Sequence, residues 1–99
     1  MNTSKIRAAI ANREIIEFTY KGHKRKAEPH IYGIKNGKRQ LLVYQIGGTS
    51  SSGPIPDWRR IDIDVIGELK NTGQKFQGKR DLPSSSDSGS WDTIIARVE

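Results

Sequence analysis

The chain has 99 residues and contains no cysteine. Without thiolates it has neither a disulfide framework nor a zinc site built on sulfur ligands. A chain free of thiols suits a reducing compartment, so we expect a cytoplasmic protein.

Long apolar segments are missing as well. No run is long enough to cross a bilayer, and residues 1–5 lack the hydrophobic segment of a secretory signal. We therefore expect no membrane partner. The length suits one domain with a core of limited size, so a deep catalytic cleft between two domains is not expected.

Sequence patterns for catalysis are also absent. His23 and His30 have no second nitrogen or sulfur ligand close in sequence, and the serines at 84–86 have no neighbouring base or nucleophile elbow. Gly47-Gly48 lacks the further glycines and the lysine of a phosphate-binding loop. We expect no enzyme activity, no resident metal and no cofactor.

What the chain does have is an uneven distribution of charge. Residues 1–80 contain 16 Lys or Arg against 7 Asp or Glu, whereas residues 81–99 contain 1 against 4. A basic body attracts polyanions, because cations that neutralise phosphates release the counterions held there. The alternative is that the basic residues only keep a small domain soluble.

The stretch around residues 36–46 organises the predicted fold. Asn36-Gly37 is typical of a two-residue hairpin turn, since both central positions of that turn need positive φ. In the strand that follows, Leu41 and Val43 share one side, and the other side also carries apolar residues, Leu42, Tyr44 and Ile46. A strand that is apolar on both sides is covered on both sides.

The residues before this stretch predict a helix and a first hairpin. Ile6, Ala9 and Ile10 recur at helical spacing in a helix that ends at residues 12–13. Alternating residues predict a strand over 14–20, a tight turn at 21–23 and a basic return strand. Pro29 cannot donate a ladder hydrogen bond, so it marks a bulge, an edge or the end of that strand.

The second half of the chain is more polar. We expect a loop over 49–56, a strand over 57–63, a helical turn or bend over 64–69, a turn at 71–73 and a buried Phe76. Residues 77–90 read as a linker or a disordered segment, and 91–98 as a final docked strand or turn. We therefore place the domain at 1–76 and a polar, Ser-rich tail at 77–99.

These elements predict a mainly β fold with a short N-terminal helix. In so small a chain, both sides of the central strand are covered only if the sheet curls over itself with the helix against one side. The expected architecture is a small β-barrel of the Src-homology-3-like or Sm-like kind.

The order and spacing of the elements from about Ile6 to Phe76 resemble the WYL domain. This domain is a small Sm-like barrel related to the Src-homology-3 barrels, and it is named for a Trp-Tyr-Leu tripeptide. The resemblance depends on the helix, the 16–20 strand, the basic return strand ending in Pro29, the Gly37 turn and a late strand closing on Phe76. Each of these features is weakly specific alone.

The chain departs from the family pattern at its characteristic motifs. Gln40-Leu41-Leu42 stands in place of the tripeptide. The later family pattern of aromatic, Arg, Leu, Asp, Arg and Ile falls on residues 61–66, where Asp62 and Val65 replace the two arginines. If the resemblance holds, the ligand pocket of the family is altered here.

The resemblance implies a regulatory module that senses a ligand or binds nucleic acid. Such domains are normally attached to a winged or helix-turn-helix DNA-binding domain in bacterial and phage regulators, and their proposed ligands are nucleotides or single-stranded nucleic acid. Only about a dozen residues precede the first strand, so the resemblance implies a stand-alone member with a role in transcription regulation.

The residues themselves point to the same class of ligand. Strand pairing can place cations beside aromatic rings, an arrangement that single-stranded nucleic acid favours. The candidate residues for binding nucleic acid or a nucleotide are Lys24, Lys26, Lys38, Arg39, Tyr44, Trp58, Arg59 and Arg60. Alternatively, the aromatic residues belong to the core and the cations are solvated edge residues that prevent strand aggregation.

A second hypothesis is a protein-interaction or oligomerisation module. An exposed sheet edge can bind another chain, and the tail offers Trp91, Ile94 and Ile95 as apolar anchors. The acidic tail is also able to lie over the basic body and block it, which leaves autoinhibition as a further alternative.

Overall fold

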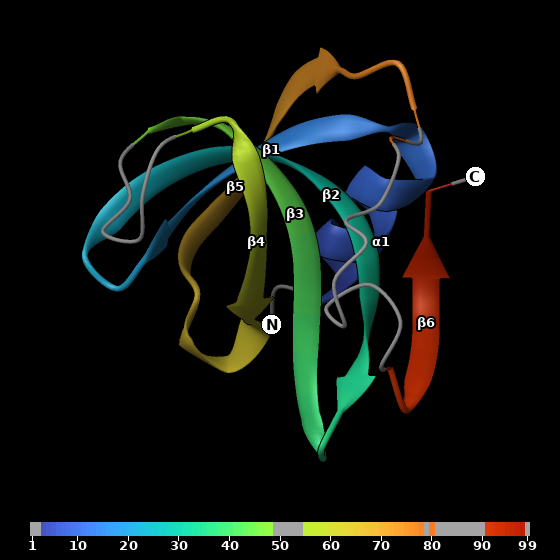
Figure 1. The fold of residues 1–99 in the computed structure, drawn as a ribbon. Helices are drawn as coiled ribbons and strands as arrows, with labels where there is room; N and C mark the ends of the chain where they lie inside the picture. Colours follow the sequence, from blue (N-terminus) through green and yellow to red (C-terminus); the bar gives the residue numbers. More distant parts are fainter. Residues whose placement is uncertain (1–2, 49–54, 79, 81–90, 99) are drawn as a thin grey trace.

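The computed structural model describes residues 3–48, 55–78, 80 and 91–98 (Figure 1). Its elements are α1 (Thr3–Asn12), β1 (Glu14–Tyr20), β2 (His23–Lys35), β3 (Lys38–Gly48), β4 (Asp57–Asp62), the short 3-10 helix η1 (Ile63–Val65), β5 (Gly67–Lys75) and β6 (Thr93–Arg97). This confirms a mainly β fold with one short N-terminal helix. Neither helix in these ranges is long and apolar enough to cross a membrane.

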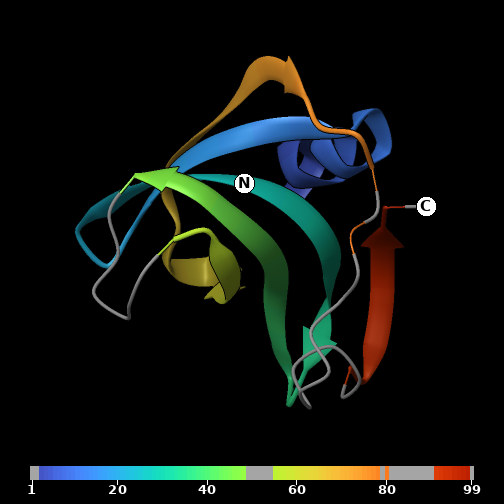
Figure 2. The same cartoon turned by 45° about the horizontal axis from the view of Figure 1, so that its top comes forward.

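Helix α1 forms as its sequence predicts. Ile6, Ala9 and Ile10 lie on one face and are buried in the core. The helix stops before Arg13, whose φ of 56° lies in the left-handed region and turns the chain into β1. Figure 2 shows α1 lying against the concave side of the curled sheet.

The β2–β3 hairpin confirms the predicted turn. Asn36 and Gly37 have φ values of 53° and 77°, and Lys35 lies opposite Lys38 across the turn. Positive φ at both central positions matches the right-handed twist of the two strands. The hairpin therefore forms the long central pair of the sheet.

Pro29 marks a bulge, one of the three outcomes that its sequence predicted. Pro29 lies opposite Val43 and Ile31 lies opposite Leu42, so His30 is an extra residue in β2. The strand does not end there but continues to Lys35. Because a bulge redirects side chains, His30 is turned into a buried position.

The sheet is curled but open. Its strand order is β4-β3-β2-β1-β5, with β6 paired to β2. Among the described residues the edge strands β4 and β5 do not pair, so the prediction of a closed barrel is wrong. The chain turns between them through η1, where the Asp62 carboxylate accepts the Asp64 N–H and Ile66 N–H donates to Ile63 O.

Both sides of the central strand β3 are nevertheless buried, as predicted. Leu41 and Val43 lie in the core with α1, and Leu42 is 1% exposed on the opposite side. We call these the inner side, which faces α1, and the outer side. Tyr44 and Ile46 are half-buried.

Strand β5 replaces the turn predicted at 71–73, so that prediction is wrong. Asn71 lies opposite Ile16 of β1, and the Thr72 hydroxyl donates to Ile15 O at 2.8 Å. Lys75 lies opposite Glu14, so residues 72–74 form a bulge within the strand, where Gly73 supplies a positive φ of 81°. Phe76 is buried as predicted, and its N–H donates to Arg13 O.

The segment after residue 90 forms a strand, as predicted. β6 runs antiparallel to the second half of β2, with Ile31 opposite Arg97 and Ile34 opposite Thr93. Val98 is buried in the core, and its N–H donates to His30 O at 2.9 Å. The predicted loop and linker fall largely on 49–54, 79 and 81–90, which lie outside the described residues.

Candidate functional site

Strand register places six of the eight candidate residues on the outer side of the sheet. Glu28 of β2 lies opposite Tyr44 of β3, which lies opposite Trp58 of β4. Side chains alternate along a strand, so the following residues share this side: Lys24, Lys26, Lys38, Tyr44, Trp58 and Arg60. We call this set the outer strip.

The middle of the outer strip is aromatic. The Tyr44 and Trp58 rings have centroids 5.2 Å apart in an edge-to-face arrangement. The His30 ring lies 4.9 Å from Trp58 and 5.2 Å from Phe76. Edge-to-face packing is a favourable arrangement of aromatic rings, so these residues form one packed cluster.

An ion pair with a buried carboxylate lies beside these rings. Glu28 accepts two hydrogen bonds from Arg80, from Nε at 2.6 Å and from Nη2 at 3.0 Å. The Glu28 side chain is 5% exposed and that of Arg80 is 47% exposed. The Glu28 carboxylate raises the pKa of Arg80, and the Arg80 guanidinium also lies 4.3 Å from the Tyr44 ring centre. The negative charge of Glu28 is therefore compensated by Arg80 within the strip.

His30 is held in one orientation by its bulge. Its Nδ1 lies 2.9 Å from Glu28 O, where it donates as Nδ1–H in the neutral ring. Burial lowers the pKa of His30, the Arg80 guanidinium lowers it further, and hydrogen bonding and the charge of Glu28 oppose these effects. A neutral ring fits these contacts.

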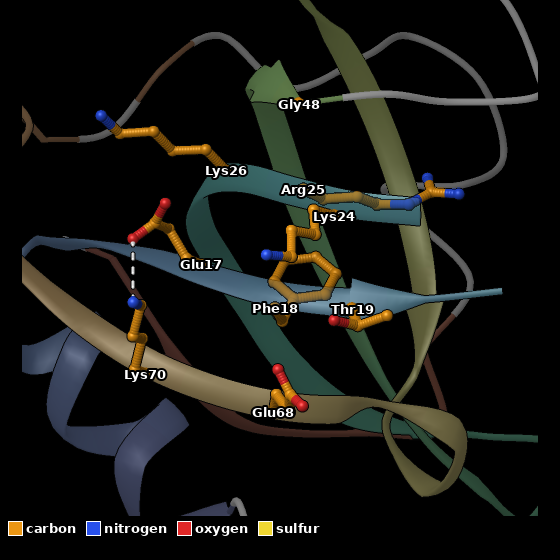
Figure 3. Close-up of a pocket in the computed structure, with 9 residues that line it drawn as sticks. All are labelled: Glu17, Phe18, Thr19, Lys24, Arg25, Lys26, Gly48, Glu68 and Lys70. Atoms are coloured by element: carbon orange, nitrogen blue, oxygen red, sulfur yellow. Dashed lines mark ion pairs between the residues drawn. The ribbon is translucent and has the colours of Figure 1, made fainter. Parts of the chain in front are cut away.

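Lys24 and Lys26 lie beside a pocket of about 210 Å³ over the β1–β2 hairpin (Figure 3). Lys70 of β5 extends from the opposite wall and pairs with Glu17 at 3.9 Å. The lining residues are Glu17, Phe18, Thr19, Lys24, Arg25, Lys26, Gly48, Glu68 and Lys70. The pocket therefore mixes lysines with two carboxylates.

Arg60 lies at the other end of the outer strip. Its guanidinium is 4.6 Å from the Trp91 ring centre, and its Nη1 donates to the Gln40 side chain at 3.2 Å. It also borders a groove of about 400 Å³ at the β2–β3 turn. The other residues of that groove are Lys35, Asn36, Lys38 and Gln40, so the candidate Lys38 is placed near Arg60.

Two candidates lie apart from the outer strip. Arg59 lies opposite Val43 on the inner side, where its side chain is 11% exposed and pairs with Asp57 at 3.1 Å. Arg39 follows the β2–β3 turn and pairs with Asp64 at 3.2 Å. The eight candidates therefore do not converge on one surface.

Sequence reasoning missed three residues with notable environments: Arg25, Glu28 and Arg80. Arg25 did carry a signal, because it falls at the inward position between Lys24 and Lys26. The pairing of Glu28 with Arg80 spans 52 residues and leaves no pattern in the sequence. Only the folded chain brings those two together.

Comparisons with known proteins identify no relative. No family model, no curated protein and no solved structure matches this chain. The resemblance to the WYL domain therefore stays a prediction.

Proposed function

We propose that this chain is a non-catalytic binding module that holds nucleic acid or a nucleotide on the outer side of β2, β3 and β4. The observation that carries the proposal is the strand register, which puts Lys24 and Lys26 on the same side of the sheet as Tyr44, Trp58 and Arg60. Cations next to aromatic rings suit a single strand, whose phosphates bind the cations while its bases stack on the rings.

The contacts within the outer strip support this ligand class. The Arg80 guanidinium lies 4.3 Å from the Tyr44 ring centre, which adds a further cation to the aromatic part of the strip. Glu28 is paired with Arg80, which reduces its repulsion of a phosphate. Each base that stacks on an aromatic residue contributes on the order of 1–3 kcal/mol.

The resemblance to the WYL domain implies the same class of ligand and would make the module part of a transcription regulator. This resemblance supports the proposal less strongly than the strand register does, because the family motif is altered at residues 40–42 and 61–66. The proposal therefore depends on the outer strip.

The test is a titration of fluorescently labelled single-stranded DNA and RNA of roughly ten nucleotides, followed by anisotropy. We expect binding that weakens roughly tenfold between about 50 and 200 mM salt, as contact with a few phosphates requires. The double variant Lys24→Glu/Lys26→Glu should lose most of this affinity, because it reverses two charges of the strip.

The matched control is Lys5→Glu/Arg7→Glu, which changes the net charge equally on α1, at the inner side of the sheet. We expect it to keep most of the affinity. Binding that is absent, that ignores salt, or that falls equally in both double variants would contradict the proposal.

The second candidate function is binding of another protein chain, and a specific observation favours it. Ile94 and Ile95 of β6 are 43% and 37% exposed, and β6 pairs with β2 alone among the described strands. An edge strand with exposed apolar residues is able to pair with a partner. In that case Ile94→Lys/Ile95→Lys should lower the mass measured by light scattering, and an unchanged mass would exclude self-association through β6.

A further inference from the structure

Strand β6 has a free edge. Among the described strands it pairs with β2 alone, so no strand lies along its other edge. In Figures 1 and 2 it is the outermost strand on its side of the molecule. The backbone N–H and C=O groups along such an edge are able to pair with a further strand. The sheet can therefore be extended at β6.

The middle of this edge is apolar and exposed. Ile94 lies opposite Gly33 and Ala96 lies opposite Tyr32, so Ile95 is an extra residue in β6. Ile94 and Ile95 are 43% and 37% exposed. Both border a groove of about 490 Å³ between β6 and α1. The lining residues of this groove are Arg7, Ile10, Ala11, Ile94, Ile95, Ala96 and Arg97. A partner that covers the two isoleucines removes apolar surface from water.

The two ends of the edge carry opposite charges. Asp92 comes directly before β6 and is exposed, and its Oδ2 accepts the Asn36 N–H at 2.7 Å. Arg97 is the last residue of β6, is exposed and has no ion pair among the described residues. Along the edge the order is therefore acidic, apolar and basic.

This order makes the edge complementary to a second copy of itself. When two copies of β6 meet antiparallel with Ile94 opposite the partner's Ile95, Asp92 comes opposite the partner's Arg97. Two-fold symmetry repeats every contact, so two apolar pairs and two pairs of opposite charge form. Cross-strand pairs of both kinds stabilise antiparallel strands. Any other chain would have to supply the same order of residues that this strand already has.

We propose that β6 pairs with β6 of a second copy of this chain, which joins the two sheets across a two-fold axis. The inference deepens the second candidate function and rests on it, because it names the partner and the register at the same edge. It does not involve the outer strip. Strands of five residues form a small interface, so we expect a weak dimer.

The first experiment is sedimentation equilibrium of the full chain between about 10 μM and 1 mM, the range in which small interfaces associate. The net charge of +6 opposes association, so the buffer contains about 150 mM salt, which screens charges more than about 8 Å apart. We expect the mass to rise with concentration from that of one chain towards that of two.

The variant Ile95→Lys should stay monomeric over the same range, because it puts a charge into the apolar middle of the interface. Its Tm at low concentration should stay close to that of the wild type, since the Ile95 side chain is exposed. A lost dimer with an unchanged Tm then reports the interface and not the fold.

Charge reversal tests the register. Asp92→Arg and Arg97→Asp should each weaken the dimer roughly tenfold, because each puts like charges opposite one another at both ends. A mixture of these two variants restores opposite charges at both ends, so it should associate more tightly than either alone. Arg97→Asp also lowers the net charge, which by itself favours association. The matched control Lys21→Asp makes the same change of charge in the β1–β2 turn and should not weaken the dimer.

The inference is overturned if the chain stays monomeric at every concentration, if the dimer ignores Ile95→Lys, or if the mixture associates no better than its components. A monomeric chain that binds a different protein at β6 would keep the second candidate function and end this inference. Oligonucleotide binding is measured separately, so the loss of the dimer and the failure of the outer strip are distinct results.

Discussion

His30 is the residue that most clearly ties this fold to pH. The ring is 2% exposed, lies between Trp58 and Phe76, and donates one hydrogen bond to Glu28 O when neutral. Protonation would place a second positive charge near Arg80 in a buried site, and hydrogen bonding to the backbone of Glu28 and Gly78 offsets this only in part. The folded protein therefore favours the neutral ring.

The first prediction concerns stability below neutral pH. Because the pKa of His30 is lower in the folded than in the unfolded chain, the unfolded chain binds more protons as the pH falls below about 6.5. The contribution of His30 is fully present above that pH and is lost as the pH falls through the folded pKa. Urea unfolding of the wild type and of His30→Phe between pH 7.5 and 5 checks this.

The variant keeps an aromatic ring and cannot titrate. Its unfolding free energy should therefore fall less with decreasing pH than that of the wild type. Equal slopes for the two proteins would show that His30 does not contribute to the pH dependence.

At the scale of elements, the ion pair between Glu28 and Arg80 connects two segments. Arg80 follows β5 in the chain, and Glu28 belongs to β2. Both hydrogen bonds involve charged groups, and the Glu28 carboxylate is almost fully buried. Such pairs contribute little when compared with an apolar replacement, but removing one partner leaves a buried charge.

The second prediction follows from that asymmetry. Arg80→Met should lower the free energy of unfolding by on the order of 1–3 kcal/mol, because Glu28 stays buried without its partner. The double variant Glu28→Gln/Arg80→Met should recover part of this loss. Urea unfolding of the two single variants, the double variant and the wild type measures the coupling, and additive losses would mean that the pair is not coupled.

At the scale of the whole molecule, the sheet depends on contacts between distant segments. Gly33 of β2 lies against β6, and a Cβ on Gly33 would meet Thr93 O at 2.3 Å and the Trp91 ring at 2.8 Å. A glycine is required there because two backbones approach closely. The last strand and Trp91 therefore dock at a place where β2 has no side chain.

The third prediction tests this docking. Gly33→Ala should push β6 away and destabilise the fold by about 1–3 kcal/mol. Hydrogen exchange of the Val98 amide, which donates to His30 O, should become faster. Gly67→Ala is the control, because its Cβ would meet nothing closer than 3.9 Å; equal effects of the two changes would refute the docking argument.

Local signals gave reliable predictions where the neighbouring residues alone set the conformation. Asn36-Gly37 has the two positive φ values that its turn requires, and Pro29 lies at a bulge because it lacks an N–H. The same approach failed at 71–73, since the Thr72 hydroxyl bond to Ile15 O and the pairing with β1 come from residues far away in the chain.

The candidate site divides in the same way. Alternation along β2, β3 and β4 already predicted which side chains share a side, because that depends only on the period of a strand. The curl of the open sheet, the stacking of Arg80 on Tyr44 and the burial of Arg25 required the tertiary structure. Each depends on the register between strands and on contacts across many residues, which no local pattern encodes.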